Sequence, residues 1–155
     1  EVIALDVGHA QLSPSIRSDR RVRVVEGVNA RYLDARQLAA ATGVVNDGID
    51  VVVADLSFIS LTMVLPALAA TVGGSAEFVV LVKPQFEAGR AEVGKGGVVR
   101  DAAVHSRVCA EAAAWIASRG WRVKGITPSP ITGPEGNVEF LLAAEKDSEV
   151  DNASD

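Results

Sequence analysis

Four short runs of apolar, largely β-branched residues most constrain how this chain can fold. Each run is bounded by polar or turn-forming residues, and the stretches between the runs are long enough to hold helices. Their hydrophobicity is continuous rather than alternating, which is typical of strands that are covered on both faces, as in a parallel sheet. The runs are Val2–Leu5, Val22–Val25, Val51–Ala54 and Phe78–Val82.

Helices are expected in the connections between the strands. The clearest runs from Asp101, a good N-cap residue, to Arg119, with Gly120 following as the residue that ends it. Its large apolar residues recur at helical spacing and therefore share one face. Shorter helices are expected over Asp34–Thr42, over Leu61–Ala70 and over Gln11–Arg17.

The end of the chain predicts an antiparallel pair of strands. Trp121–Ile126 and Val138–Ala144 are joined by a proline-rich loop that is too stiff and too short for a helical crossover. This gives a mostly parallel α/β sheet with one reversed strand at its end, an architecture that is also found in class I methyltransferases. We expect one domain over residues 1–145, followed by a frayed polar tail over residues 146–155.

Composition narrows the classes of function. The 155 residues fit one domain, and 15 basic against 20 acidic residues give a net charge of -5, the opposite of a stand-alone nucleic-acid-binding protein. Any role with RNA would need a local basic patch or another domain. The single cysteine, Cys109, excludes an internal disulfide, and with two histidines we expect no metal site. A reducing cytoplasm fits this composition best.

Two features bear on processing and on membranes. The chain starts at Glu1 and enters an apolar strand at once, without the basic segment of a signal peptide, so we expect a fragment of a longer polypeptide. Residues 51–72 contain one charge, Asp55, but that aspartate and Pro66 argue against a membrane span. A buried strand followed by a helix explains this segment equally well.

Charged residues stand at the ends of the expected strands, where open parallel sheets bind their ligands. Lys83 is the clearest candidate for a functional residue among them. The apolar run before it should bury its stem, while Asp55 and Glu139 can lie beside its ammonium group. Burial lowers the pKa of a lysine and nearby carboxylates raise it, so the sequence leaves its protonation state open. Five groups are expected to converge on one edge: Asp6, Glu26, Asp55, Lys83 and Glu139.

Four separated motifs, in order along the chain, resemble the TlyA-type haemolysin A family of FtsJ-like rRNA 2′-O-ribose methyltransferases. The resemblance extends from Val2 to about Leu142. It implies a class I, Rossmann-like fold whose first strand and Gly-rich loop have no counterpart in this chain. The motifs are Ala54–Ser60, Leu81–Glu87, Gly94–Val99 and Gly136–Phe140.

The resemblance implies the chemistry and the site residues. Family members use S-adenosylmethionine and a Lys-Asp-Lys-Glu tetrad, in which Asp55, Lys83 and Glu139 match the last three members and the first lysine is missing. Asp55 would also lie near the methyl donor. Asp6 matches the acid that accepts the hydroxyl groups of the cofactor ribose, and Asn29 lies near the position that contacts adenine. An S4-like RNA-binding domain lies upstream in the family, and the isolated fragment is expected to be inactive.

A glycine-rich segment raises an alternative function, the hydrolysis of nucleotides by a P-loop. Residues 89–95 have the glycines and the lysine of a P-loop, but Gly96 stands where Ser or Thr should hold Mg²⁺. We interpret Glu87–Arg100 instead as a mobile lid over the site. Three of its side chains are expected to face RNA phosphates: Arg90, Lys95 and Arg100.

These observations favour a cytoplasmic, S-adenosylmethionine-dependent enzyme that methylates ribose 2′-hydroxyls, by resemblance those of cytidine, in ribosomal RNA or a ribosomal subunit. No metal or membrane is required. Two alternatives stay open: a methyltransferase of the same fold with another acceptor, and a non-catalytic module that binds RNA or protein. The family sheet order places the first two runs on one side of the missing strand and the third and fourth on the other.

Overall fold

The computed structural model describes residues 1–44 and 48–146, and the chain divides into two compact units. Unit 1 comprises residues 1–49 and 63–73, and unit 2 comprises residues 50–62 and 74 onward. The expected tail lies outside the described residues apart from Lys146, which ends the last strand. The strands are β1 (Val2–Asp6), β2 (Val22–Glu26), β3 (Val51–Ala54), β4 (Glu77–Val82), β5 (Trp121–Pro128) and β6 (Phe140–Lys146), and the helices are α1 (Pro14–Arg17), α2 (Ala35–Thr42), α3 (Leu61–Thr71), α4 (Pro84–Glu87) and α5 (Ala102–Ser118).

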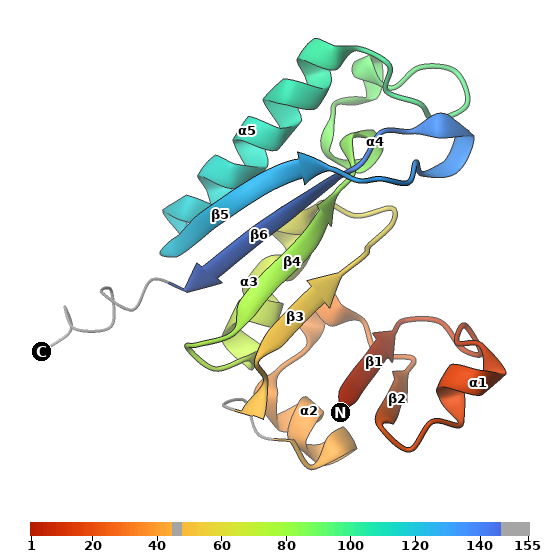
Figure 1. The fold of residues 1–155 in the computed structure, drawn as a ribbon, viewed down its shortest axis with the longest axis vertical. Helices are drawn as coiled ribbons and strands as arrows, with labels where there is room; N and C mark the ends of the chain where they lie inside the picture. The colour runs from red at the N-terminus through yellow and green to blue at the C-terminus, as the bar shows by residue number, and fades with distance from the viewer. Residues whose placement is uncertain (45–47, 147–155) are drawn as a thin grey trace, which may run out of the picture. The chain divides into compact units, whose positions relative to one another are not determined.

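The strands form two sheets, and all four apolar runs are strands as expected (Figure 1). In unit 1, β1 and β2 pair in parallel. In unit 2 the order is β3-β4-β6-β5, with β3 parallel to β4 and β6 antiparallel to both of its neighbours. The α/β class with a mostly parallel sheet is therefore confirmed, and the strand order within each sheet is the one that the family resemblance implies.

Local capping explains where the helices of unit 1 begin and end. The Asp34 carboxylate accepts a hydrogen bond from the Gln37 amide at 2.8 Å, and Gly43 ends α2 in the left-handed conformation at φ 73°. Leu38 and Thr42 are buried on one face of α2, as its sequence pattern predicts.

Helix α1 is shorter than expected. The sequence pattern suggested a start at Gln11, but the helix begins at Pro14, with Ser13 in an extended conformation before it. A proline disfavours the helical conformation of the residue that precedes it, so Pro14 fits only the first turn. Residues 10 and 11 instead belong to the loop that follows β1.

The core of unit 2 lies on one face of its sheet. Alternate residues of β4 are buried, with Phe78, Val80 and Val82 exposed by 5%, 1% and 0%. The prediction that both faces of every strand are covered is wrong for β3, where Val51 and Val53 are exposed by 55% and 75%. Strand β3 stands at the edge of its sheet and pairs only with β4, so neighbouring side chains reach it from one side.

Strand β6 inserts between β4 and β5, which is the position that the family sheet order gives to its last strand, whereas the residue pattern taken alone suggested the end of the sheet. It therefore contributes to the centre of the core, with Leu142 and Ala144 fully buried. Helix α5 packs against β4, β5 and β6 (Figure 1), and it buries Val104, Val108 and Ile116. The expected caps are present, with Asp101 before the helix and Gly120 after it at φ 82°.

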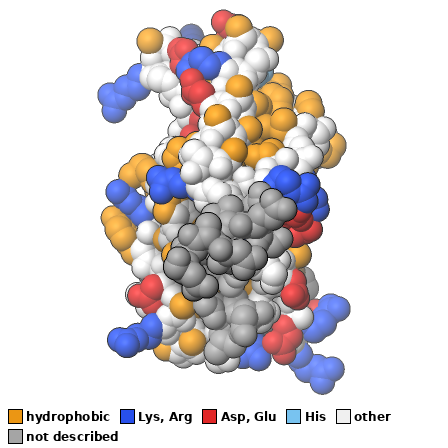
Figure 2. Space-filling view, turned by 90° about the vertical axis from the view of Figure 1, so that its left-hand side faces the viewer, with side chains coloured by type: hydrophobic (Ala, Val, Ile, Leu, Met, Phe, Trp, Pro, Cys, Tyr) orange, Lys and Arg blue, Asp and Glu red, His pale blue; other side chains and the backbone are white. Residues whose placement is uncertain are grey.

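The described surface carries charged side chains of both signs. On the face shown in Figure 2, basic and acidic side chains are interspersed, and its described residues form no continuous basic patch. Within residues 1–44 and 48–146, no helix has both the length and the apolar character that crossing a membrane requires.

The cap of α5 generates a test of the fold. Asp101 accepts a hydrogen bond from the Ala103 amide at 2.8 Å. We expect Asp101→Ala to lower the free energy of unfolding by about 1 kcal/mol, because an N-terminal amide of the helix loses its acceptor. Urea unfolding of the complete gene product measures this change. Asp101→Asn, which keeps an acceptor oxygen, serves as the matched control and should unfold close to the wild type.

Candidate functional site

The parallel pairing of β3 with β4 brings Asp55 and Lys83 together. Each residue directly follows its strand, and the two strands end at the same edge of the sheet. The Lys83 Nζ atom lies 2.5 Å from Asp55 Oδ1 and donates a hydrogen bond to Ser57 Oγ at 3.2 Å. Lys83 is only 8% exposed, whereas Asp55 is exposed. A buried lysine stem therefore presents its amine next to an exposed carboxylate.

Glu139 has a different partner from the one expected. Its buried carboxylate, 6% exposed, accepts a hydrogen bond from Gln85 Nε2 at 2.9 Å. Among residues 1–44 and 48–146 it forms no ion pair with Lys83, so the expectation that it lies beside the ammonium group is wrong for this structure. Gln85 belongs to α4, which starts directly after Lys83, and its amide thus supplies the donor that the lysine was expected to supply.

The carboxylate of Glu139 also packs against the backbone of Gly133. A Cβ atom at Gly133 would overlap Glu139 Oε1, so no larger residue fits without moving the carboxylate. The backbone of Gly133, with φ -77° and ψ -172°, is one that any residue adopts. Glycine is therefore needed at this position for space and not for conformation.

The loop between β3 and α3 and the neighbouring helix α4 contain further residues that the sequence pattern did not single out. Glu87 accepts hydrogen bonds from the Leu61 amide at 2.8 Å and from Ser60 Oγ at 2.7 Å, so α4 holds the start of α3. Phe58 has a left-handed backbone, φ 64°, and is 90% exposed, with its ring 5.1 Å from that of Phe86. An exposed aromatic ring is a surface on which a nucleobase can stack.

The signal for these residues was present in the sequence. Ser57 and Phe58 lie in the same motif as Asp55, and Gln85 and Glu87 lie in the same motif as Lys83. Their partners, however, are far away along the chain, and only the fold brings them into contact.

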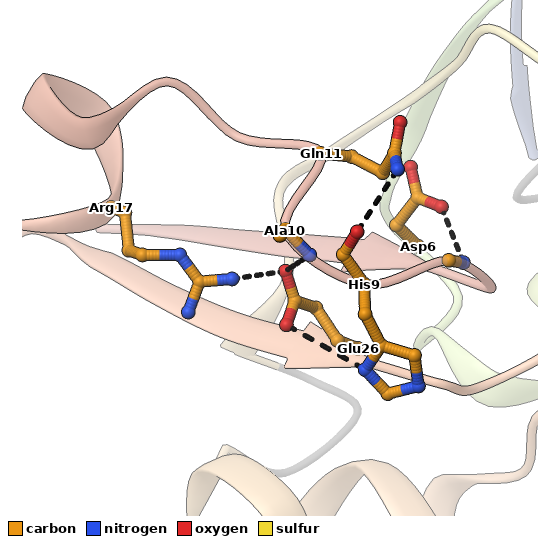
Figure 3. Close-up of polar contacts among 7 residues, drawn as sticks. Asp6, His9, Ala10, Gln11, Arg17 and Glu26 are labelled. Atoms are coloured by element: carbon orange, nitrogen blue, oxygen red, sulfur yellow. Dashed lines mark hydrogen bonds and ion pairs between the residues drawn. The ribbon is translucent and has the colours of Figure 1, made fainter.

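In unit 1, Asp6 and Glu26 end the paired strands β1 and β2 and lie opposite each other in the ladder. Asp6 Oδ1 accepts a hydrogen bond from the Gly8 amide at 2.7 Å (Figure 3). Its other carboxylate oxygen has no hydrogen-bond partner in the described part of the chain, and the residue is exposed. Asp6 therefore offers an open acceptor at the end of its strand.

Glu26 is occupied by contacts that hold the loop after β1. It accepts a hydrogen bond from the Ala10 amide at 3.0 Å, pairs with Arg17, and lies 3.9 Å from His9 Nδ1 (Figure 3). The hydrogen bond from Arg17 holds the pKa of the Glu26 carboxyl below its ordinary value. Glu26 thus stays charged and shapes the loop next to Asp6.

The side-chain oxygen of Asn29 is engaged in a hydrogen bond within its own loop. Its Oδ1 atom accepts a hydrogen bond from the Arg31 amide at 3.0 Å and caps the 3₁₀ turn Ala30–Tyr32. This fixes the side-chain carbonyl and leaves the amide hydrogens available as donors. Asp6 and Asn29 belong to unit 1, whereas Asp55, Lys83 and Glu139 belong to unit 2.

The basic loop, which we define as residues 90–100, carries three exposed cations. None of the three forms an ion pair within the described residues, whereas Glu92 of the same loop pairs with Arg107. The loop is anchored at its far end, because Val99 is 2% exposed and donates its amide hydrogen bond to Asn137 Oδ1 at 3.1 Å. The three cations are Arg90, Lys95 and Arg100.

The same loop does not have the form of a P-loop. A P-loop leads directly into a helix whose N-terminus binds phosphate. Here Gly96 and Gly97 form a turn with φ 79° and 76°, and α5 begins only at Ala102. Within residues 1–44 and 48–146, no group of three or more His, Cys, Asp or Glu side chains could hold a metal ion.

Comparison with known proteins places this geometry in a family. The chain matches the model of the FtsJ-like methyltransferases over residues 1–146. It is 46% identical over 141 residues to the 16S/23S rRNA (cytidine-2′-O)-methyltransferase TlyA of Mycobacterium tuberculosis, a match that covers 91% of this chain and 50% of that protein. It is also 39% identical over 142 residues to Hemolysin A of Brachyspira hyodysenteriae, covering 91% of this chain and 56% of that protein.

A solved structure supports the same assignment. The protein described as "Putative hemolysin from Streptococcus thermophilus" has a TM-score of 0.85 and 41% identity, and the match covers 95% of this chain and 51% of that one. The chain thus spans about half the length of the curated relatives it matches. The strand order, the paired Asp55 and Lys83, and a family model that extends over residues 1–146 lead to one conclusion: the chain belongs to the FtsJ-like methyltransferase family.

Proposed function

We propose that this chain is most of the catalytic domain of an S-adenosylmethionine-dependent enzyme that methylates the 2′-hydroxyl of cytidine ribose in ribosomal RNA. The observation that carries the proposal is the buried Lys83, whose amine contacts Asp55 and Ser57 at the end of two parallel strands. A lysine that is 8% exposed is costly to bury unless its amine is paired, and here the pair with Asp55 holds the amine at the edge of the sheet where open parallel sheets bind ligands. We infer rRNA as the methyl acceptor from the relative that is named as an rRNA (cytidine-2′-O)-methyltransferase.

The residues of unit 1 fit the cofactor. The open carboxylate oxygen of Asp6 suits the ribose hydroxyl groups, and the free amide hydrogens of Asn29 suit a nitrogen acceptor of adenine. The cofactor would supply an activated methyl group on a sulfonium centre. Asp55, exposed at the end of β3, would lie near that group.

Transfer of a methyl group to a hydroxyl is an in-line displacement, so the protein must align the hydroxyl and remove its proton. Lys83 is placed to orient the 2′-hydroxyl and to receive its proton at Nζ when that amine is neutral. Asp55 stabilises the resulting ammonium, because its carboxylate lies 2.5 Å away. Glu139, held by Gln85 instead of by the lysine, contributes a buried carboxyl group to the site.

Ribosomal RNA would be held in part by the basic loop. Its three cations are exposed and free of ion pairs within the described residues, as phosphate contacts require. The net charge of -5 makes a further source of RNA affinity necessary, and an S4-like RNA-binding domain in the same polypeptide would provide it. We place this reaction in the cytoplasm, with an rRNA or a ribosomal subunit as the partner.

The first prediction concerns Lys83. In the complete gene product, Lys83→Ala should remove nearly all methyl transfer to ribosomal subunits, because the amine that receives the proton is absent, while cofactor affinity stays within about threefold. Transfer of labelled methyl groups measures the first quantity and calorimetry the second. Lys124→Ala, which removes a lysine paired with Glu77 on the same sheet, is the control. Near-normal turnover by the Lys83 variant would refute the assignment.

The second prediction concerns the cofactor. Asp6→Ala should weaken the binding of S-adenosylmethionine by about tenfold or more, because the charged acceptor of a hydrogen bond is removed. Calorimetric titration of the complete gene product measures the dissociation constant. Asp19→Ala, which removes a half-buried aspartate paired with Arg21 in the same unit, should leave it unchanged. Equal affinity of both variants would exclude Asp6 from the cofactor site.

The third prediction concerns the basic loop. Replacing Arg90, Lys95 and Arg100 together by alanine should weaken RNA binding and reduce the slope of log affinity against log salt by about 1 for each phosphate that the loop no longer neutralises. Filter binding at several salt concentrations gives the slope. Arg122→Ala, at an arginine that pairs with Glu145 on β6, is the control. An unchanged slope in the triple variant would show that the loop does not contact phosphates.

A further inference from the structure

The side chain of Asn137 makes three hydrogen bonds in a buried position, and both of its amide hydrogens are used. It is 3% exposed, and its Oδ1 atom accepts a hydrogen bond from the Val99 amide at 3.1 Å. Its Nδ2 atom donates to the carbonyl oxygens of Gly97 at 3.0 Å and Pro134 at 3.2 Å. Aspartate has no hydrogens for these two carbonyls, so an amide is required.

These bonds help to hold the basic loop in place, together with the contact of His105 Nε2 with the Val99 carbonyl at 2.7 Å and the pair of Glu92 with Arg107. Gly97 and Val99 stand between Lys95 and Arg100, two of the cations that we assign to RNA phosphates. The turn itself closes through the Gly94 amide and the Val98 carbonyl at 2.8 Å. Asn137 is thus the side chain that fastens this turn to the segment before β6.

The same residue also connects to the Glu139 carboxylate. The backbone carbonyl of Asn137 accepts a hydrogen bond from the Gly133 amide at 2.7 Å. The backbone of Gly133 in turn packs directly against Glu139 Oε1. A continuous series of contacts therefore runs from the basic loop through Asn137 and Gly133 to a buried carboxylate of the candidate catalytic site.

We propose that Asn137 is a positioning residue that couples the binding of RNA phosphates on the basic loop to the placement of the Glu139 carboxylate. The inference rests on the proposed function, because it needs RNA on that loop. Coupling of this kind is reciprocal, so a displaced loop moves the carboxylate and a displaced carboxylate loosens the loop. Two sequence motifs that lie far apart, Gly94–Val99 and Gly136–Phe140, then act as one structural unit.

The test is a double-mutant cycle in the complete gene product, with rRNA as substrate. Asn137→Asp is nearly isosteric and keeps the acceptor for Val99, but it places an oxygen opposite two carbonyls. We expect its kcat to fall about tenfold, because the displaced segment shifts Gly133, whose backbone positions the carboxylate. Lys95→Ala should then reduce kcat/KM at least about threefold less in the Asn137→Asp background than in the wild type, because the loop is already uncoupled.

Two further variants separate positioning from a simple decrease in stability. Ile116→Val removes a methyl group from the buried face of α5, outside these contacts, and its effect should multiply with that of Lys95→Ala. Gly133→Ala leaves the Asn137 side chain intact and displaces the carboxylate, so kcat should fall, and by the reciprocal coupling RNA affinity should also fall, by at least about twofold. This variant decides the question if the buried aspartate unfolds the domain.

The outcomes distinguish the inference from the function on which it rests. If the wild-type protein does not methylate rRNA, the proposed function is refuted, and the coupling with it. If the wild type is active but the effects of Asn137→Asp and Lys95→Ala simply multiply, only the coupling is overturned. Full kcat in Gly133→Ala would overturn it in the same way, whereas reduced kcat together with a non-multiplicative cycle supports it.

Discussion

The parallel ladder between β3 and β4 is the constraint on which the candidate catalytic site depends. It aligns the ends of two strands that are separated in the sequence by a helix, and it thereby brings Lys83 Nζ to 2.5 Å from Asp55 Oδ1. The alternating burial of β4 fixes the register, because a shift by one residue would turn its buried valines outward. Lys83 breaks this alternation, because it is buried directly after the buried Val82, at the point where the strand ends. The register of the sheet therefore places both the buried residues of β4 and the two residues, Asp55 and Lys83, that follow the strands.

Acidic residues at the strand ends have two different tasks. In unit 1, Glu26 is occupied by Arg17 and by the Ala10 amide, and it holds the loop in which Asp6 keeps one oxygen open. In unit 2, Asp55 is exposed and contacts the lysine, whereas Glu139 is buried and contacts a neutral amide. All four side chains carry the same carboxyl group. Whether a carboxyl group remains available to a ligand depends on whether neighbouring donors already occupy its oxygen atoms.

Much of the local structure could be predicted because its causes are local. The helix after Asp101 begins and ends where its capping residues stand, and the apolar runs are strands because of their β-branched residues. Other features depend on contacts between distant segments and were predicted wrongly. These are the place of β6 between two other strands and the contact of Glu139 with Gln85 instead of Lys83. Gln85 lies two residues after Lys83, and nothing in the sequence relates it to Glu139. The two side chains meet only when the sheet and α4 are formed. The late start of α1 has a local cause, Pro14, which the helical pattern alone did not take into account.

The sequence by itself determined which residue types stand at the strand ends, because motifs such as Leu81–Glu87 fix residue type and spacing there, and it thereby predicts the candidate site residues. It also determined the α/β class, since hydrophobic periodicity reflects burial directly. Only the tertiary structure decided how these groups pair and which of them stay open. Asn137 shows the reason: its partners Gly97 and Val99 are about 40 residues earlier in the chain, with separations of 40 and 38. Hydrogen bonds act over about 3 Å, so they report on positions in space that no local pattern encodes.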